Sequence, residues 1–444
     1  MSVYRGRFGV EQAERLLWRA GFGPRPGEAE KLARKGLEGA VHSLTRPRRK
    51  ERLGGPPPHD QDGHPLAPAD AWGHDHLWWL DRMLRTNRPL TERMTLVWHD
   101  WFATSNEGVG SQRLMIHQNE MLRKNALGSF RDLVVRVTRD PAMLLWLSGA
   151  QNREDSPNEN YARELMELFT LGADRGYTED DVREHARALT GFRNDWDDGV
   201  GPNNFRFDTE YHDGGTKRIF GKKGRFEWRD SCEMCLAHPS HSSFFVEKLW
   251  SYFIPVPPGR RTRRALQSLY VRGRYEVRPV VEAILRHPSF YEGPRMVKPP
   301  VVYLAGLLRG SGRWLDTESW TWLSDMMRQR LFVPPNVAGW EDDRWLDTGT
   351  WRARWLTASQ VLREREEDPG KPYDETEEPA AAVDRALAFW GRPAVSATTR
   401  GRLLSFAERV NSAADKPYKR RGYFASRQNA LRVLVATSPD MQTS

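Results

Sequence analysis

Apolar residues recur along most of the chain at intervals of three and four, which is the spacing of one face of an α-helix. This period predicts helices over residues 10–20, 26–35, 71–86, 90–102, 111–126, 130–138, 230–237, 242–253, 261–270, 277–286 and 299–308. Two or three closing helices are expected within 380–438. The chain is therefore predicted to be mainly α, a single large multi-helix domain with long irregular loops and one short β-hairpin.

The clearest local signal predicts a helix over 157–171. Ser156 can cap it, and Glu159 stands where a capping box requires an acid. A second helix over 179–190 is predicted from Thr178, which is a suitable cap. The short connection between them indicates an αα-hairpin.

Three segments organise the chain in this interpretation. Residues 1–363 form a helical core domain that includes the paired helices and an irregular loop over 192–228, rich in Asn, Asp, Gly and aromatic residues. Residues 364–379 form an acidic linker loop. Residues 380–444 form C-terminal helices that pack on the same domain. Loops as long as 192–228 are uncommon unless they are functional.

Composition limits the class of protein. The 444 residues include 18 Trp, 18 Phe and 12 Tyr, enough large side chains for one core or two. No apolar run is long enough to span a membrane, and the start of the chain has no apolar segment typical of a secretion signal. Two cysteines exclude a disulfide framework. We expect a cytoplasmic protein, or one exported only together with a partner.

The net charge is +9, and the positive charge is partly concentrated at residues 46–52, 260–264 and 416–421. Such runs can bind a polyanion, although short basic runs beside Pro and Gly are more often solvated loops, which disfavours nucleic acid as a partner. The many Trp side chains also allow a stacking surface for a glycan, while most of them are expected in the core.

The helix over 157–171 has an apolar side and a polar side. The polar side carries Asn160, Arg163, Glu164 and Glu167, and the helix over 179–190 repeats the arrangement with Arg187. One interpretation is a solvated face with structural ion pairs. The other is a cleft in which Glu164 and Glu167 act as acid/base groups or metal ligands while Arg163 and Arg187 orient an anionic substrate.

Two histidine positions are candidates for the same site. His99 lies among aromatic residues, where a core role is as compatible as a catalytic one. His212 and Asp213 fall in the irregular loop, which suits either a site or a turn. The hypothetical catalytic set is Glu164, Glu167, His99, His212 and Asp213, with Glu164, Glu167 and His212 as the metal ligands.

Cys232, Cys235, His238 and His241 follow one another at intervals of three. Two thiolates and two imidazoles are a sufficient tetrahedral set for zinc. Pro239 interrupts the run, however, and one short segment rarely wraps all four corners of a tetrahedron. Zinc is therefore disfavoured, and buried helix cysteines with surface histidines are expected instead.

Ordered motifs link the chain to a known family. They are Trp18–Pro24, Trp98–Phe102, Gln118–Arg123, Ala126–Gly128, Asp140–Leu144, Pro157–Gly172, Tyr177–Thr178, Asp181–Arg183, Ala186–Gly191, His212–Asp213, Lys248–Trp250, Lys298–Pro299, Pro334–Trp340 and Ser438–Gln442. On these stretches the chain resembles the bacterial domain-of-unknown-function-1800 family over nearly its whole length.

The resemblance implies that residues 158–167, His99, His212–Asp213 and 336–340 belong to the family signature. It supports a carboxylate-centred site and adds Asn160, Asn336 and Trp340 to the expected substrate-binding residues. Family members often carry Asp where this chain has Ser148, and aliphatic residues where it has two cysteines, which weakens any ligand role there. Many relatives are exported, often alongside a sulfatase-like partner family.

The leading hypothesis is a metal-dependent enzyme, a hydrolase or an oxidoreductase, with its site between the helices over 157–171 and 179–190 and the loop of His212. A divalent metal is the implied cofactor. The alternative is a non-catalytic scaffold, or a glycan- or protein-binding partner of a sulfatase-like protein. A third hypothesis is polyanion binding, through a site that includes Lys419, Arg420 and Arg421.

Overall fold

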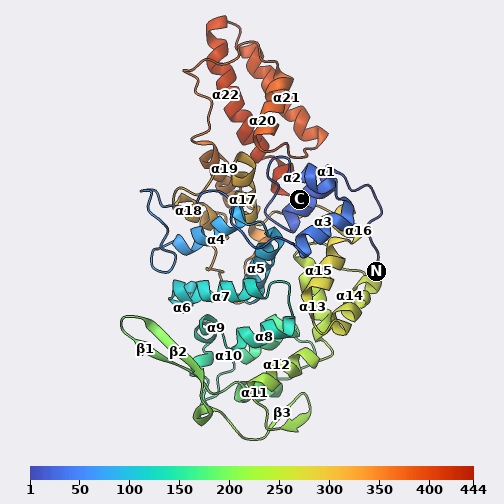
Figure 1. The fold of residues 1–444 in the computed structure, drawn as a ribbon, viewed down its shortest axis with the longest axis vertical. Helices are drawn as coiled ribbons and strands as arrows, with labels where there is room; N and C mark the ends of the chain where they lie inside the picture. Colours follow the sequence, from blue (N-terminus) through green and yellow to red (C-terminus); the bar gives the residue numbers. More distant parts are fainter.

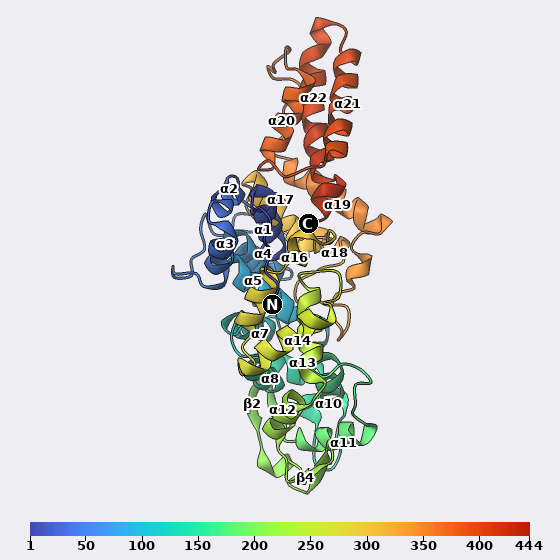
Figure 2. The same cartoon turned by 90° about the vertical axis from the view of Figure 1, so that its right-hand side faces the viewer.

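The computed structural model describes all 444 residues, with 56% of them in helices, 23 α-helices, and two small antiparallel two-stranded sheets. The predicted mainly α fold class is confirmed. The molecule is elongated (Figure 1). The three helices within residues 379–436, which we call the tower, lie at one end, and the β-hairpins lie at the other. Figure 2 shows the same tower from the side, with the N-terminal helices beneath it.

The N-terminal half contains the elements up to α11. They are α1 (Val10–Arg19), α2 (Glu28–Ala33), α3 (Gly36–Thr45), α4 (His74–Arg85), α5 (Pro89–Trp101), α6 (Asn106–Val109), α7 (Gln112–Lys124), α8 (Phe130–Thr138), α9 (Pro141–Trp146), α10 (Asn160–Glu164), a π-helix (Leu165–Thr170) and α11 (Glu179–Ala188). Most agree with the predicted helices to within a few residues, whereas α3 and the short helices α6 and α9 were not predicted.

The C-terminal half begins with two hairpins and continues with helices. Its elements are β1 (Phe192–Asp197), β2 (Gly201–Phe207), β3 (Lys217–Ile219), β4 (Lys222–Gly224), α12 (Trp228–Ala237), α13 (His241–Ser251), α14 (Arg260–Arg272), α15 (Val277–Leu285), α16 (Pro288–Glu292), α17 (Pro300–Ser311), α18 (Ser319–Met326), α19 (Thr348–Leu362), α20 (Pro379–Phe389), α21 (Ala397–Ala413), α22 (Pro417–Ala436) and α23 (Pro439–Gln442). Short 3-10 helices cover Gly149–Gln151, Thr209–Tyr211 and Asp342–Arg344.

The interior consists of two apolar clusters. One has 54 buried residues and joins α1–α3 to α8, the paired helices and α12–α16. The other has 40 and joins α4 to α17–α20 and the C-terminal helices. Helix α5 contributes Trp98 to the first cluster and Leu96 to the second. The tower helices thus share a core with α17–α19, while the domain bounds around 364–379 stay a prediction.

The start of the first paired helix differs from the prediction. Helix α10 begins at Asn160, and Asn158, not Ser156, accepts the amide of Asn160 at 2.9 Å. The amide of Asn158 itself donates to Asn152 at 2.8 Å. That bond holds the chain before residue 160 against the 3-10 segment, so the capping box predicted at Ser156 is wrong.

The second paired helix was predicted correctly. Thr178 caps α11 by accepting the amide of Asp181 at 3.2 Å, and the Asp181 carboxylate accepts the amide of Thr178 at 2.9 Å. Both bonds satisfy amide groups that the first turn of a helix leaves free. The connection between the two helices is short, as expected for an αα-hairpin.

The region 192–228 forms two hairpins, β1–β2 and β3–β4, where one was expected. The turn of the second hairpin places Phe220 and Gly221 at φ +47° and +75°. Two successive positive φ values are the mark of a type I′ hairpin turn, which usually carries Asn or Gly. The phenylalanine at the first position concealed this turn in the sequence.

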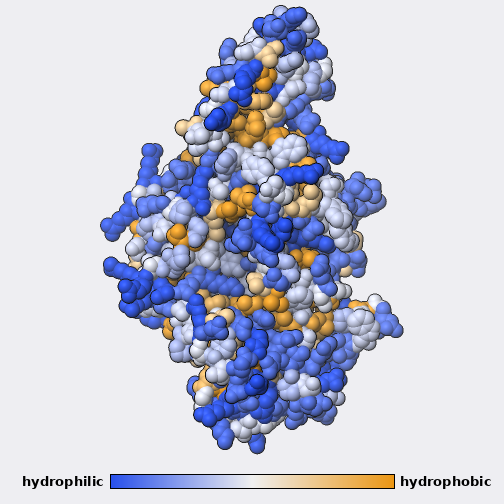
Figure 3. Space-filling model, turned by 180° about the vertical axis from the view of Figure 1, so that it is seen from behind, coloured by the Kyte–Doolittle hydropathy of each residue, from blue (hydrophilic) through white to orange (hydrophobic).

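The surface is mostly hydrophilic, with small apolar patches at the base of the tower and across the middle of the molecule (Figure 3). None of the helices combines the length and the apolar character that crossing a lipid bilayer requires.

Candidate functional site

The first of the paired helices, α10, continues into six residues of π-helix, Leu165–Thr170. The carbonyls in the last turn of a helix have no partner within the helix, and here side chains from other elements donate to them. Trp101 Nε1 donates to the carbonyl of Phe169 at 3.0 Å, Lys248 Nζ to that of Leu168 at 2.9 Å, and His241 Nδ1 to that of Thr170 at 2.8 Å. The π-helix, a feature frequent at functional sites, serves here as a joint between α5, α10 and α13.

The two arginines predicted to orient a substrate already form ion pairs with carboxylates of the protein. Arg163 contacts Glu159 at 3.0 Å, Glu167 at 3.3 Å and Glu179 at 2.7 Å, and its side chain is 32% exposed. Arg187 pairs with Glu184 at 2.8 Å. These groups form half-exposed ion pairs. The arrangement agrees with the first interpretation of the polar face, a solvated surface with structural ion pairs. Such pairs contribute little stability individually because water screens them.

Glu164 is the exception on this face. Its carboxylate is half-buried and takes part in no ion pair or hydrogen bond. Burial, and then the neighbouring charge of Glu167, raises the pKa of Glu164 above its usual value. Asn160, also predicted for substrate binding, is exposed to solvent at the start of α10.

The predicted metal ligands do not come together. No group of three or more His, Cys, Asp or Glu side chains is arranged to hold a metal ion. Glu167 is engaged by Arg163, while His212 directs Nδ1 to the carbonyl of Thr190 at 2.9 Å. Glu164, Glu167 and His212 therefore do not form the predicted metal site, because Glu167 and His212 are engaged elsewhere and Glu164 has no second ligand beside it.

Asp213 organises the loop after the first hairpin. It accepts Arg187 Nε at 2.6 Å and the amide of Gly215 at 2.8 Å, and Lys217 Nζ lies 3.7 Å away. Burial acts to raise the pKa of Asp213, but these donors outweigh it and hold the pKa below its usual value. An ionised, fully partnered carboxylate of this kind anchors β3 to α11.

The cysteines and histidines of the zinc hypothesis are not assembled either. Cys232 and Cys235 are fully buried on α12, and burial raises the pKa of the Cys232 thiol to about 12. His238 Nε2 lies 3.2 Å from the carbonyl of Gly176. His241, expected at the surface, is buried and lies 2.9 Å from the Tyr270 hydroxyl. The four side chains belong to the core and a loop, not to one tetrahedron.

His99 is fully buried in α5, among the rings of Trp79, Phe332 and Trp340 at centroid distances of 5.2, 5.6 and 5.5 Å. Neither of its ring nitrogens has a hydrogen-bond partner. Burial lowers the pKa of His99 to about 3, so the ring is neutral. Asn336 is exposed and accepts the amide of Ala338 at 2.8 Å, which shapes the loop leading to Trp340.

The loop that contains Trp340 packs on α5. The backbone amide of Trp340 donates to Asp100 Oδ1 at 2.8 Å, and the Tyr252 hydroxyl donates to Asp100 Oδ2 at 2.7 Å. Gly339, at φ +102°, leaves no room for a Cβ because Asp100 would lie 2.3 Å away. The signature loop 336–340 therefore closes over the carboxylate of α5 from one side.

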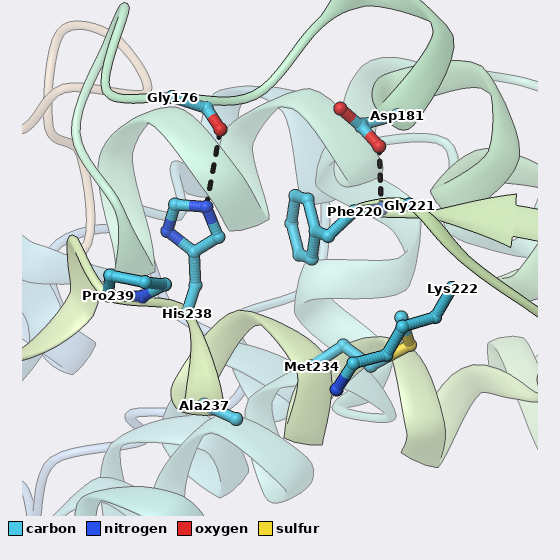
Figure 4. Close-up of a pocket in the computed structure, with 9 residues that line it drawn as sticks. All are labelled: Gly176, Asp181, Phe220, Gly221, Lys222, Met234, Ala237, His238 and Pro239. Carbon is cyan, nitrogen blue, oxygen red and sulfur yellow. Dashed lines mark hydrogen bonds between the residues drawn. The ribbon is translucent and has the colours of Figure 1, made fainter.

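One cavity adjoins the predicted carboxylate site. It measures about 370 Å³ and lies between α11, the β3–β4 turn and the end of α12 (Figure 4). Its polar groups are already used within the fold: Asp181 accepts the amide of Phe220 at 2.7 Å, and the ring of His238 packs on that of Phe220 at 4.8 Å. Little besides the Lys222 amine remains to recognise a ligand there.

A larger cavity, which we call the basic pocket, measures about 600 Å³ and lies where α3, α5, α7 and α15 meet. In Figure 1 these helices lie together in the middle of the molecule. Its lining consists of His42, Thr45, Arg46, Pro47, Arg48, Arg88, Thr91, Arg123, Lys124, Ala126, Leu127, Gly128 and Arg278. Six of the lining side chains are Arg or Lys, and none is Asp or Glu.

Only two of the six cations are neutralised. Arg46 pairs with Glu282 at 2.7 Å and Arg123 with Glu92 at 2.6 Å, and neither carboxylate is among the lining residues. The other four, Arg48, Arg88, Lys124 and Arg278, form no ion pair, while Arg88 donates only to the carbonyl of Arg49 at 2.8 Å. The pocket therefore carries an excess of positive charge.

Several N–H groups of the basic pocket have no partner. Arg88 Nε, Arg123 Nη1 and Arg278 Nε are all removed from water and make no hydrogen bond. Arg123 is only 7% exposed. Buried guanidinium nitrogens without partners also occur away from this cavity, for example in Arg85 and Arg313, so these three do not by themselves mark a ligand site.

Residues 15–443 match the family described as protein of unknown function DUF1800. The chain belongs to this family. No curated protein and no solved structure matches it.

Two stretches by which this DUF1800 chain resembles its family contribute to the basic pocket: Gln118–Arg123 supplies Arg123, and Ala126–Gly128 supplies three further lining residues. Both motifs and the basic run 46–52 are visible in the sequence, but no spacing or period connects them. Arg88 and Arg278 are isolated in the sequence. Only the packing of α5 against α7 and of α3 against α15 reveals the pocket.

Proposed function

We propose that this DUF1800 protein binds an anionic ligand in the basic pocket. The proposal rests on one observation: the cavity is lined by six cations and no carboxylate, and four of the six cations form no ion pair. A cavity of about 600 Å³ is within the usual range for small-molecule sites. This develops the third hypothesis from the sequence and moves the site from the C-terminal basic run to the centre of the fold.

The chemistry of the pocket favours an oxyanion. Guanidinium groups donate two parallel hydrogen bonds to carboxylate or phosphate oxygens, and such charge-assisted bonds are stronger than neutral ones. Helix α5 begins at Pro89 beside Arg88, so the positive end of its dipole adds to the same field. An anion would compensate the four unpaired charges at once.

Thermal unfolding tests the proposal. Inorganic phosphate is expected to raise the melting temperature of the wild-type protein by a few degrees at saturating concentration, because a ligand of the folded state stabilises it by mass action. The rise is expected to vanish in Arg88→Gln and Arg278→Gln, and to persist in Lys419→Gln at the tower. Equal shifts in all four proteins, or none in the wild type, would contradict anion binding in the pocket.

Catalysis at the signature helices is the second candidate. The observation that favours it is the unpaired, half-buried carboxylate of Glu164 with its raised pKa. Its neighbours Arg163 and Glu167 are committed to ion pairs, and the proposed ligands do not converge. Anion binding therefore has the stronger structural support, and a carboxylate-centred reaction stays a prediction.

A further inference from the structure

The basic pocket is rich in donors and poor in acceptors. Its lining has no Asp, Glu, Asn, Gln, Ser or Tyr side chain, and its only hydroxyl groups are those of Thr45 and Thr91. Thr45 Oγ1 lies 3.0 Å from both the Val41 carbonyl and Glu282, so its proton is already used. A ligand with many hydroxyl or amine groups would find few side-chain acceptors. The pocket thus selects a molecule that presents oxygen acceptors on nearly every side.

The lining also lacks a stacking surface. It contains no Phe, Tyr or Trp, its only ring apart from proline is His42, and its apolar side chains are Ala126 and Leu127. Proteins that bind single-stranded nucleic acid or nucleosides usually stack bases on aromatic rings. A nucleobase would gain little in this cavity, which separates the expected ligand from nucleotides and nucleic acids.

The charge exceeds what one phosphate balances. A phosphate monoester carries a charge of about −1.5 to −2 near neutral pH, whereas four lining cations have no protein counter-charge. The cations come from separate elements: Arg88 lies before α5, Lys124 at the end of α7 and Arg278 at the start of α15. A single tetrahedral anion cannot contact every wall of a cavity of about 600 Å³.

We propose that the ligand of the basic pocket is a compact anion with several phosphoryl groups and no nucleobase, of the chemical class represented by inorganic tripolyphosphate. This inference rests on the proposed function and narrows it. Each phosphoryl group accepts from a different wall, and Arg123, held by Glu92, is the most buried of the lining cations.

Isothermal titration calorimetry of the full chain at fixed salt tests the ligand class. The probes are sodium tripolyphosphate, orthophosphate, sulfate and a single-stranded oligonucleotide. Tripolyphosphate is expected to bind at least tenfold more tightly than orthophosphate or sulfate, about 1.4 kcal/mol or more. Arg88→Gln and Arg278→Gln are each expected to weaken tripolyphosphate at least tenfold, and Lys419→Gln is expected to leave it unchanged.

The outcomes separate this inference from the proposed function. Orthophosphate binding as tightly as tripolyphosphate, with the same sensitivity to Arg88→Gln, would overturn the ligand class and leave anion binding intact. An oligonucleotide that binds more tightly than tripolyphosphate, and that Arg88→Gln weakens, would also overturn the ligand class and leave anion binding intact. No binding of any probe, or equal weakening by Lys419→Gln, would overturn both. Circular dichroism of each variant checks that a lost signal is not lost folding.

Discussion

Replacing Glu92 with leucine is expected to lower the free energy of unfolding by about 3–5 kcal/mol, the usual effect of leaving a buried charge without its partner. Glu92 is 1% exposed and accepts Arg123 Nε at 2.6 Å and Arg123 Nη2 at 3.0 Å. Arg82 Nε at 3.2 Å and Trp79 Nε1 at 3.3 Å complete the set. Urea denaturation at constant pH measures the loss as a lower midpoint.

The double variant Glu92→Leu/Arg123→Leu is the matched control. Replacing both members of a buried pair by apolar side chains is often close to neutral, so the double variant is expected to recover most of the loss. It should also bind anions more weakly, because Arg123 lines the basic pocket. If the free energy of unfolding of Glu92→Leu lies within 1 kcal/mol of the wild-type value, the pair of Glu92 and Arg123 does not stabilise the pocket wall.

Acidification is expected to destabilise the protein through His99. Burial lowers its folded-state pKa to about 3, whereas an unfolded histidine titrates near 6.5. Between these values the unfolded chain binds a proton that the folded chain excludes. The contribution of His99 to stability is therefore intact above pH 6.5 and is lost, at about 1.4 kcal/mol per pH unit, as the pH falls toward 3.

The variant His99→Phe isolates this effect. Its ring fits among Trp79, Phe332 and Trp340, and the substitution breaks no hydrogen bond because both nitrogens of His99 are unpartnered. The stability difference between the two proteins, measured in urea from pH 7 to pH 4, should change by about 1.4 kcal/mol per pH unit. Subtraction cancels opposing groups such as Asp140, whose pKa burial raises to about 7. A constant difference would mean that His99 is hydrated or partnered.

The sequence predicted helices well where apolar residues keep a regular period. Residues 130–138 were expected as a helix and form α8 with the same ends. The helix α3 was missed because two glycines interrupt its pattern. Helices α18 and α19 were missed because they expose Trp322, Trp351 and Trp355 to solvent, which blurs the distinction between their faces.

The candidate site could be predicted only in part. The charged residues of the signature helices were identified, but whether they face a cavity or one another depends on contacts between helices. Arg163 meets Glu179, and Arg187 meets Asp213, only after α10, α11 and the following loop have packed. The basic pocket is less visible still, since its walls come from four segments between residues 42 and 278.

The most direct test of the account is the position of a bound oxyanion in a crystal. Crystals soaked in sodium tungstate, whose metal scatters anomalously, are expected to show a peak in the basic pocket within hydrogen-bonding distance of Arg88, Arg123 and Arg278. The peak should be absent from crystals of Arg278→Gln. Strong peaks only at other basic segments, such as the tower around Lys419, with the pocket empty, would contradict the central claim.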